Sequence, residues 1–308
     1  MRAVIKINVG RGQLALAGAI LLCSVSLHAQ PITVRDGAGQ LVTLQVPARR
    51  IASLMSSAID IVVALGLADR IAARTRYDTA SVVANAVNVG GGIDPSVETL
   101  IAARPDLFVA WKGQFSSAVV NRMRALGIPV YLVETKDTTA LYATVRDLGA
   151  LLGVTPRATV AANTLRAELR AVQAKNAGTP RLRAVYVISR SPVIISAASS
   201  FIGQLIGVAG ADTPFRDVSG EFPTLSLEAF IARDPDVLIV GRGDNGGRQL
   251  DVLRSTPGWR DLRAVRNGAV VEVDGEQWGR PTLHVGALVR DLALQLQRVA
   301  PMVRRSDD

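Results

Sequence analysis

The sequence predicts an α/β protein made of two similar lobes, each with a mostly parallel sheet, bridged by one long helix. Three observations predict this fold class. Short helices alternate with continuous apolar strands along almost the whole chain after residue 30. An unbroken helical segment at 156–177 separates two such alternating halves. The segments 97–113 and 227–243 share one pattern of residues, so the second half repeats the order of the first.

Residues 1–29 predict a secretory signal peptide. The segment begins with three basic residues and continues with an apolar run, 14–27, that is too short to span a bilayer comfortably. We expect cleavage near Ala29, with an uncleaved anchor as the alternative. Cys23 raises the question of a lipoprotein, but Leu22 before it is too large for a lipobox. We therefore expect an exported protein located in the periplasm.

Cleavage changes what the composition allows. Cys23 is the only cysteine, so the mature chain has no disulfide and no thiolate metal site. His28 is also lost, which leaves His284 as the only histidine. The leader removes three positive charges, so the net charge falls from +9 to +6. The remaining basic residues are scattered along the chain, which argues against nucleic acid as a partner.

The first lobe is predicted to cover residues 30–154. It begins with two short strands around a glycine turn. Ser56 or Ser57 is expected to cap the first helix, and Gly66 to end it. Strand and helix then alternate, through a glycine-rich loop, to an amphipathic helix. The expected segments are 31–46, 50–55, 56–66, 87–111, 116–134 and 138–154.

The bridging helix is predicted over residues 155–178. Thr155 suits the N-cap, Pro156 the first helical position, and Gly178 the stop. At 1.5 Å per residue such a helix is roughly 33 Å long, about the width of a small domain.

The second lobe is predicted over residues 179–308 and repeats the alternation. A serine pair precedes its first helix, as in the first lobe, and Gly210 ends that helix. The last helix closes the chain. The expected segments are 181–189, 199–211, 224–241, 270–274 and 282–300.

The two repeated segments align without a gap. Glu98 falls on Glu228, Pro105 on Pro235 and Asp106 on Asp236. Helix-to-strand units in α/β proteins share apolar spacing, and proline is a common helix stop, so the match taken alone has an ordinary explanation. Together with the long helix, it indicates duplicated lobes.

The combination resembles the class III periplasmic substrate-binding proteins of ABC importers for iron–siderophore, haem and cobalamin. "VGGGIDPSVETLIAARPDLFVAW" followed by "RMRALGIPVYLVE" carries most of the resemblance, and "LSLEAFIARDPDVLIVG" matches the second lobe. The resemblance extends over essentially the whole mature chain. It implies a ligand cleft between the lobes, no enzymatic activity and an inner-membrane ABC permease as partner.

The resemblance implies a role for Glu98 and Glu228, since one acidic residue on each lobe docks onto the permease. Two distant carboxylates suit a two-fold symmetric partner. The alternative is that both simply complement a helix macrodipole. An acid–base pair of a glycosidase is not expected, because equivalent positions in separate lobes lie too far apart.

Ligands bind at the carboxyl ends of strands in α/β sheets, so loops at those ends supply the candidate cleft residues. They are Met55, Ser56, Tyr77, Gly91, Gly92, Trp111, Lys112, Ser199, Phe201, Phe222, Arg242, Trp278 and Arg280.

Aromatic side chains at these ends suit a flat macrocycle. Trp111 ends a buried strand and matches a ligand-contacting aromatic of the cobalamin-binding branch; the alternative is a tryptophan at the edge of the core. Trp278 matches another cleft position of the family. Tyr77 can stack, donate a hydrogen bond or ligate haem iron, or it is plain packing. Trp259 is expected to pack on a surface helix.

A single mature histidine cannot build the multi-histidine sites of zinc- and manganese-binding relatives. His284 falls in the apolar pattern of the closing helix and is expected to be structural. The ligand should therefore arrive as a preformed metal chelate, with no cofactor or metal held by the protein.

The class of chelate stays open. Arg74, Arg76, Lys112, Arg242 and Arg280 can face an anionic siderophore or haem propionates, or they are solvated. The aromatic residues favour a cobalamin-like corrinoid first, then a ferric siderophore, then haem. Phosphate-loop and catalytic-triad patterns are absent from the sequence, so an enzyme is the weaker alternative, beside a chelate sensor. Nothing in the sequence suggests more than a monomer.

Overall fold

The computed structural model describes residues 30–113, 117–134, 136–242 and 248–304. The predicted signal peptide, including Cys23, lies outside these residues. Pro31–Asp308 forms one compact unit. It begins with the expected hairpin, in which β1 (Ile32–Arg35) pairs antiparallel with β2 (Leu41–Leu44). Among the described residues, no helix is long and apolar enough to cross a membrane.

The first lobe is built on a five-stranded sheet in the order β5-β4-β3-β6-β7, and every neighbouring pair in it is parallel. The order places β3, the first strand of this sheet in the chain, at its centre, with later strands added on both sides. The strands are β3 (Ile51–Ser53), β4 (Ile71–Arg74), β5 (Val87–Asn88), β6 (Leu107–Trp111) and β7 (Val130–Val133).

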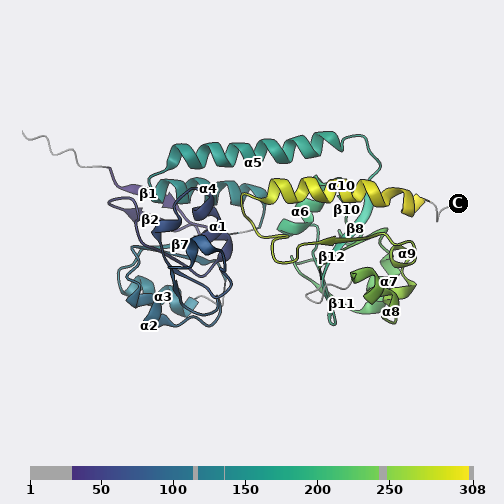
Figure 1. The fold of residues 1–308 in the computed structure, drawn as a ribbon, viewed down its shortest axis with the longest axis horizontal. Coiled ribbons are helices and arrows are strands. Elements are labelled where there is room, and N and C mark those ends of the chain that lie inside the picture. The colour runs from purple at the N-terminus through teal and green to yellow at the C-terminus, as the bar shows by residue number, and fades with distance from the viewer. Residues whose placement is uncertain (1–29, 114–116, 135, 243–247, 305–308) are drawn as a thin grey trace, which may run out of the picture. The chain divides into compact units, whose positions relative to one another are not determined.

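Both faces of this sheet are buried, which explains why its strands are apolar without alternation. Along β6, Leu107 and Val109 belong to one apolar cluster, whereas Phe108 and Ala110 belong to another on the opposite face. Helices cover the two faces (Figure 1). They are α1 (Ser56–Ala64), α2 (Val97–Ala102), α3 (Ser117–Ala125) and α4 (Thr138–Leu151), with short 3-10 turns at Ala68–Arg70 and Ser81–Val83.

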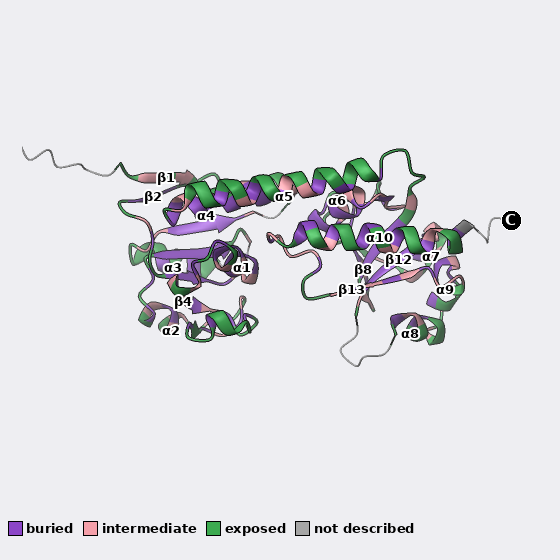
Figure 2. Cartoon of the chain, turned by 45° about the horizontal axis from the view of Figure 1, so that its top comes forward, coloured by how far each residue is buried: buried purple, intermediate pink, exposed green. Residues whose placement is uncertain are grey.

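The long helix α5 (Thr155–Lys175) links the two lobes. It packs against α4 of the first lobe and against α10 of the second, as Figure 1 shows. Its buried residues recur at helical spacing, and Figure 2 shows the opposite face exposed. The buried residues are Ala158, Ala162, Leu165, Leu169 and Val172.

The second lobe is built on a sheet in the order β11-β9-β8-β12-β13, with β10 also paired to β8. β8, β12 and β13 are parallel, whereas β9 is antiparallel to β8 and β11 antiparallel to β9. The strands are β8 (Leu182–Arg190), β9 (Val193–Ile195), β10 (Ala211–Asp212), β11 (Thr224–Leu225), β12 (Val237–Gly241) and β13 (Val270–Val273).

Of the helices of the second lobe, α6, α7 and α10 lie in expected segments, whereas α8 and α9 were not predicted. The last of them, α10, runs beside α5. They are α6 (Phe201–Val208), α7 (Leu227–Arg233), α8 (Gln249–Ser255), α9 (Arg263–Arg266) and α10 (Val285–Arg304), with a 3-10 turn, η4, at Trp259–Asp261.

The two repeated segments form the same structure. Ser96 and Ser226 each cap a helix by accepting a hydrogen bond from the backbone N–H three residues further on. Both segments then turn into a strand through a residue with positive φ, +47° at Arg104 and +35° at Asp234. The predicted duplication of the lobes is confirmed at the level of individual backbone turns.

Several local expectations were wrong. α1 is capped by neither serine: Met55 holds the N-cap position and makes no side-chain cap bond. α5 begins one residue earlier than expected: Val154 holds the N-cap position and Thr155, predicted as the cap, is the first helical residue. Trp259 lies in η4 with 2% of its surface exposed, so it is a core residue and not a surface one. His284 is exposed and precedes α10, which begins at Val285.

Candidate ligand-binding cleft

A hollow of about 470 Å³, called the cleft hollow below, opens at the carboxyl ends of β3, β4 and β13. Strands of both sheets therefore deliver residues to it. Five of the predicted cleft residues line it, together with five that the sequence did not indicate, among them Glu276. The five predicted residues are Met55, Ser56, Tyr77, Trp278 and Arg280.

Met55 and Ser56 are held at the end of β3 by short-range hydrogen bonds. The Ser53 hydroxyl accepts from the N–H of Met55 at 3.0 Å and can donate to its carbonyl at 3.2 Å. Leu54 donates its N–H to Val109 of the neighbouring strand β6. The chain is thus fixed to the sheet just before it enters α1, and that places the first residues of the helix at the rim of the hollow.

Tyr77 is presented by a tight turn after β4. The buried Asp78 carboxylate accepts hydrogen bonds from the N–H of Thr75 at 2.8 Å and from its hydroxyl at 2.7 Å. The Thr75 hydroxyl oxygen in turn accepts from the N–H of Tyr77. With the turn closed beneath it, the Tyr77 ring stands outward and is 61% exposed.

The third wall is the 274–284 loop, which connects β13 to α10. Asp274 accepts hydrogen bonds from the N–H groups of Glu276 and Gln277, and its carbonyl accepts from the N–H of Trp278. Trp278 is 4% exposed, so it anchors the loop and offers little ring surface to a ligand. Within the described residues its indole nitrogen is buried without a hydrogen-bond partner. Arg280 follows and lines the hollow.

Of the four predicted cleft aromatics besides Trp278, three are exposed next to strands and one, Phe201, is buried. Besides Tyr77, Trp111 at the end of β6 is 42% exposed, and Phe222 before β11 is 49% exposed. The Trp111 ring lies close above Gly113. Phe201 begins α6 and is 4% exposed within the main core, so the structure gives it a packing position.

Several predicted cations already have partners. Lys112 forms an ion pair with Glu134 at 2.9 Å, and this hydrogen bond is the main reason that the pKa of Glu134 lies below its ordinary value. Arg76 pairs with Asp94 at 2.9 Å. Arg74 donates to the carbonyls of Val83 and Thr75. Arg242, exposed at the end of β12, and Arg280 have no ion pair among the described residues.

The glycines and Ser199 have structural surroundings. A side chain at Gly91 would collide with Asp94, and one at Gly92 with the carbonyl of Leu54. Gly92 therefore lets the 90–94 loop approach the end of β3 closely, and Gly91 leaves room for the Asp94 side chain of the same loop. The Ser199 hydroxyl donates to the carbonyl of Gly220.

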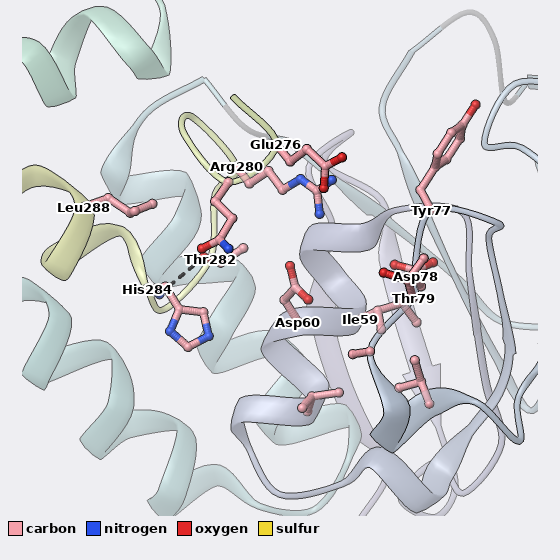
Figure 3. Close-up of a pocket in the computed structure, with 14 residues that line it drawn as sticks. Ile59, Asp60, Tyr77, Asp78, Thr79, Glu276, Arg280, Thr282, His284 and Leu288 are labelled. Atoms are coloured by element: carbon pink, nitrogen blue, oxygen red, sulfur yellow. Dashed lines mark hydrogen bonds between the residues drawn. The ribbon is translucent and has the colours of Figure 1, made fainter. Parts of the chain in front are cut away.

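A second hollow, called the inner chamber below, has a volume of about 270 Å³ and shares Tyr77, Glu276 and Arg280 with the cleft hollow. Figure 3 shows Asp60 entering it from α1, and Arg280 and His284 entering from the 274–284 loop. Burial raises the pKa of Asp60 above its ordinary value, and the positive charge of Arg280 opposes that rise.

The sequence did not indicate Asp60, Glu276 or His284. The available signal for Asp60 was its place one turn after Ser56, on the helix that follows β3. Among the described residues no group of three or more His, Cys, Asp or Glu side chains is arranged to hold a metal ion.

Glu98 and Glu228 occupy equivalent places on the two lobes. Each lies in the first turn of its helix, α2 or α7, two residues after the capping serine, and each is exposed. Both are therefore accessible to a partner, and both also complement the helix macrodipole.

Comparison with known proteins covers both sheets. The sequence model of the periplasmic binding protein family matches residues 51–276. A vitamin B12-binding protein of Vibrio parahaemolyticus is 27% identical over 241 residues, which are 77% of this chain and 85% of that protein.

Two solved structures have the same two-lobe fold. The apo form of a periplasmic haem-binding protein from Roseiflexus superimposes with a TM-score of 0.73 at 23% identity, over 82% of this chain and 99% of that one. A protein of an Fe3+-hydroxamate ABC transport system from Saccharomonospora viridis gives 0.71 at 22% identity, over 86% and 98%.

Proposed function

The chain belongs to the periplasmic binding protein family, and from that premise we propose that it captures a preformed metal chelate and delivers it to an ABC permease. It is a binding protein and not an enzyme. The chelate is a cobalamin-like corrinoid or a ferric siderophore, bound in the cleft between the two lobes. The protein acts in the periplasm, after cleavage of its signal peptide near Ala29.

The cleft hollow is the observation that carries this proposal. It lies at the carboxyl ends of β3, β4 and β13, which is where α/β sheets bind ligands. Met55 and Tyr77 reach it from the first lobe, and Arg280 reaches it from the second. A ligand held there contacts both lobes at once, so its affinity depends on the distance between the lobes.

A corrinoid is the first candidate. The relative from Vibrio parahaemolyticus is a vitamin B12-binding protein. The exposed rings of Tyr77, Trp111 and Phe222 suit a large flat ligand, since aromatic faces stack on conjugated macrocycles. A ferric siderophore fits the same surface less specifically, with Arg242 and Arg280 opposite its negative charge.

Haem, after the corrinoid and the siderophore, is the alternative ligand, and Tyr77 is the observation that favours it. Its phenol is exposed at the rim of the hollow, and tyrosine is a known axial ligand of haem iron. Arg280 can then pair with a propionate.

Delivery requires a docking surface, and we assign it to Glu98 and Glu228. Both are exposed at equivalent positions of the two lobes. Each carboxylate can form one salt bridge with one half of a two-fold symmetric permease.

Tryptophan fluorescence tests the ligand class directly. The protein from Gln30 onward is titrated with cyanocobalamin, a ferric hydroxamate and haemin, with N-acetyltryptophanamide as the control for light absorbed by the chelate. Trp278 lines the cleft hollow and Trp111 is exposed at a strand end, so a bound chelate should quench tryptophan emission. We expect one chelate to quench with a submicromolar Kd, and Trp111→Phe to weaken its binding. No quenching by any of the three chelates overturns the proposal.

A further inference from the structure

The inner chamber contains polar groups that the protein does not satisfy. The side chains of Asp60, Arg280 and His284 make no hydrogen bond or ion pair within the described part of the chain. Nearby charged groups do find partners, as Asp78 does with Thr75. Asp60 is the member of this set whose burial has a cost, because a carboxylate that loses hydration without gaining a partner is destabilised.

The partial burial of Asp60 in this chamber disfavours its charged form. Burial raises the pKa of its carboxyl group, and Arg280 only partly offsets that effect. A bound group that donates a hydrogen bond to Asp60 would replace the water that the carboxylate has lost.

The chamber is accessible from the cleft. It shares Tyr77, Glu276 and Arg280 with the cleft hollow, so a ligand in the cleft can extend one side arm into it. Its volume is about 270 Å³. Ile59 and Val63 add apolar wall from α1. These dimensions suit a short aliphatic arm with a polar end.

The charges determine which polar end fits. Acceptors from Asp60 and Glu276 stand beside donors from Arg280 and His284. Asp78 also lines the chamber, but one of its carboxylate oxygens already accepts two hydrogen bonds from Thr75. A primary amide has both an N–H₂ donor and a carbonyl acceptor, so it can satisfy both sets. A carboxylate would satisfy the donors but would face Asp60, and an ammonium group would satisfy the acceptors but would face Arg280.

We propose that the inner chamber is a subsite for a primary-amide side arm of the ligand. The assignment of this arm to a chelate rests on the proposed function, whereas the affinity of the chamber for an amide does not. Cobalamin has primary-amide arms on its corrin ring and haem has propionates, so the subsite favours a corrinoid over haem.

His284 gives this proposal a clean reporter, because it is the only histidine from Gln30 onward. The mature protein is titrated at a fixed neutral pH with propionamide, sodium propionate and propylammonium chloride. The imidazole resonances of His284 are followed by ¹H–¹³C NMR and identified by their loss in His284→Gln. We expect propionamide to shift them saturably, with an affinity at least tenfold higher than that of the two charged probes.

Variants localise the response. Asp60→Ala removes an acceptor. Arg280→Met removes the guanidinium donors and keeps a long side chain. Each change should weaken propionamide binding about tenfold, as expected for the loss of a hydrogen bond to a charged group. Asp69→Ala removes an exposed carboxylate of the same lobe outside the chamber and should leave the affinity unchanged. Unfolding curves confirm that each variant is folded.

The results separate the two proposals. If propionamide shifts His284 but no chelate quenches tryptophan fluorescence, the amide subsite holds and the chelate-binding function fails. If a chelate quenches tryptophan fluorescence while propionamide leaves His284 unmoved, or propionate binds better, the amide subsite is overturned and the function stands. Equal affinities in Asp60→Ala and wild type also overturn the subsite.

Discussion

Asp106 and Asp236 hold the same position in the two sheets. Each donates its N–H to a carbonyl near the start of the central strand: Asp106 to Arg50, just before β3, at 2.9 Å, and Asp236 to Arg183, the second residue of β8, at 2.8 Å. Each carboxylate also accepts from backbone N–H groups of that segment: Asp106 from Arg49 and Arg50, and Asp236 from Arg183. Both side chains therefore fasten the start of a lateral strand to the start of the central one.

Removing this fastening should destabilise the fold. Asp106→Ala leaves two backbone N–H groups without their acceptor, and we expect a loss of about 1–3 kcal/mol in the free energy of unfolding. Urea denaturation measures it. Asp251→Ala, an exposed acid in the first turn of α8, should change stability by less than about 0.5 kcal/mol. Similar values for both variants would show that the bonds of Asp106 contribute nothing.

The sequence predicted the two lobes because the repeated features are local. A capping serine, a proline after the helix and an apolar strand all lie within one short segment, and each lobe has a copy. The cap of α1 was predicted wrongly because Ser53, at the end of the preceding strand, bonds Met55 and fixes the entry to the helix. Such a contact follows from backbone geometry that the residue pattern does not contain.

The stability of an Asp60→Asn variant should depend on pH in a specific direction. Burial raises the pKa of Asp60 above 3.8, so the folded state binds the proton more tightly than the unfolded chain. Wild-type stability is therefore lost as pH rises through the raised pKa. Asp60→Asn should be more stable than wild type at pH 7, and the difference should vanish below pH 3.8. A wild type more stable than the variant at pH 7, by urea midpoint, would mean that Arg280 outweighs burial.

The tryptophans should separate stability from binding. Trp259 is buried against Phe230, with ring centroids 5.0 Å apart, so Trp259→Ala should cost about 3–5 kcal/mol of unfolding free energy. Trp111→Ala, at an exposed strand end, should cost far less and should weaken chelate binding. Thermal and urea unfolding, with binding measured on the folded protein, test both. Equal losses of stability would place Trp111 in the core.

The docking assignment predicts a defect in transport without a defect in binding. Glu98→Lys together with Glu228→Lys should abolish uptake of the chelate in cells that depend on this protein. Chelate affinity should stay within about twofold, since both residues lie on helices outside the cleft hollow. Asp251→Lys is the matched control, because it incurs the same helix-dipole cost in a first turn. Normal uptake in the double variant would contradict the docking role and show that the two glutamates only complement the dipoles of their helices.

The site was predictable only where it follows strand ends. Met55 and Ser56 line the cleft hollow where the predicted 50–55 strand ends. Tyr77 also lines it, but the strand that presents it, β4, was not predicted. Trp278 was placed at the cleft, but its ring is buried as the anchor of its loop. The meeting of Asp60 with His284 depends on how α1 packs near the 274–284 loop, far along the chain, and no local pattern encodes that.

The central claim is that a chelate binds at the strand ends that carry Tyr77 and Trp111. Equilibrium dialysis tests it most directly, by comparing the affinity of the quenching chelate for wild type and for the Tyr77→Ala, Trp111→Ala double variant. The account predicts one chelate per protein at submicromolar Kd. It also predicts at least a tenfold loss in the double variant at unchanged stability, because both rings are exposed after parallel strands of the first lobe. Retention of the chelate with equal affinity by wild type and double variant would contradict a binding site at these strand ends.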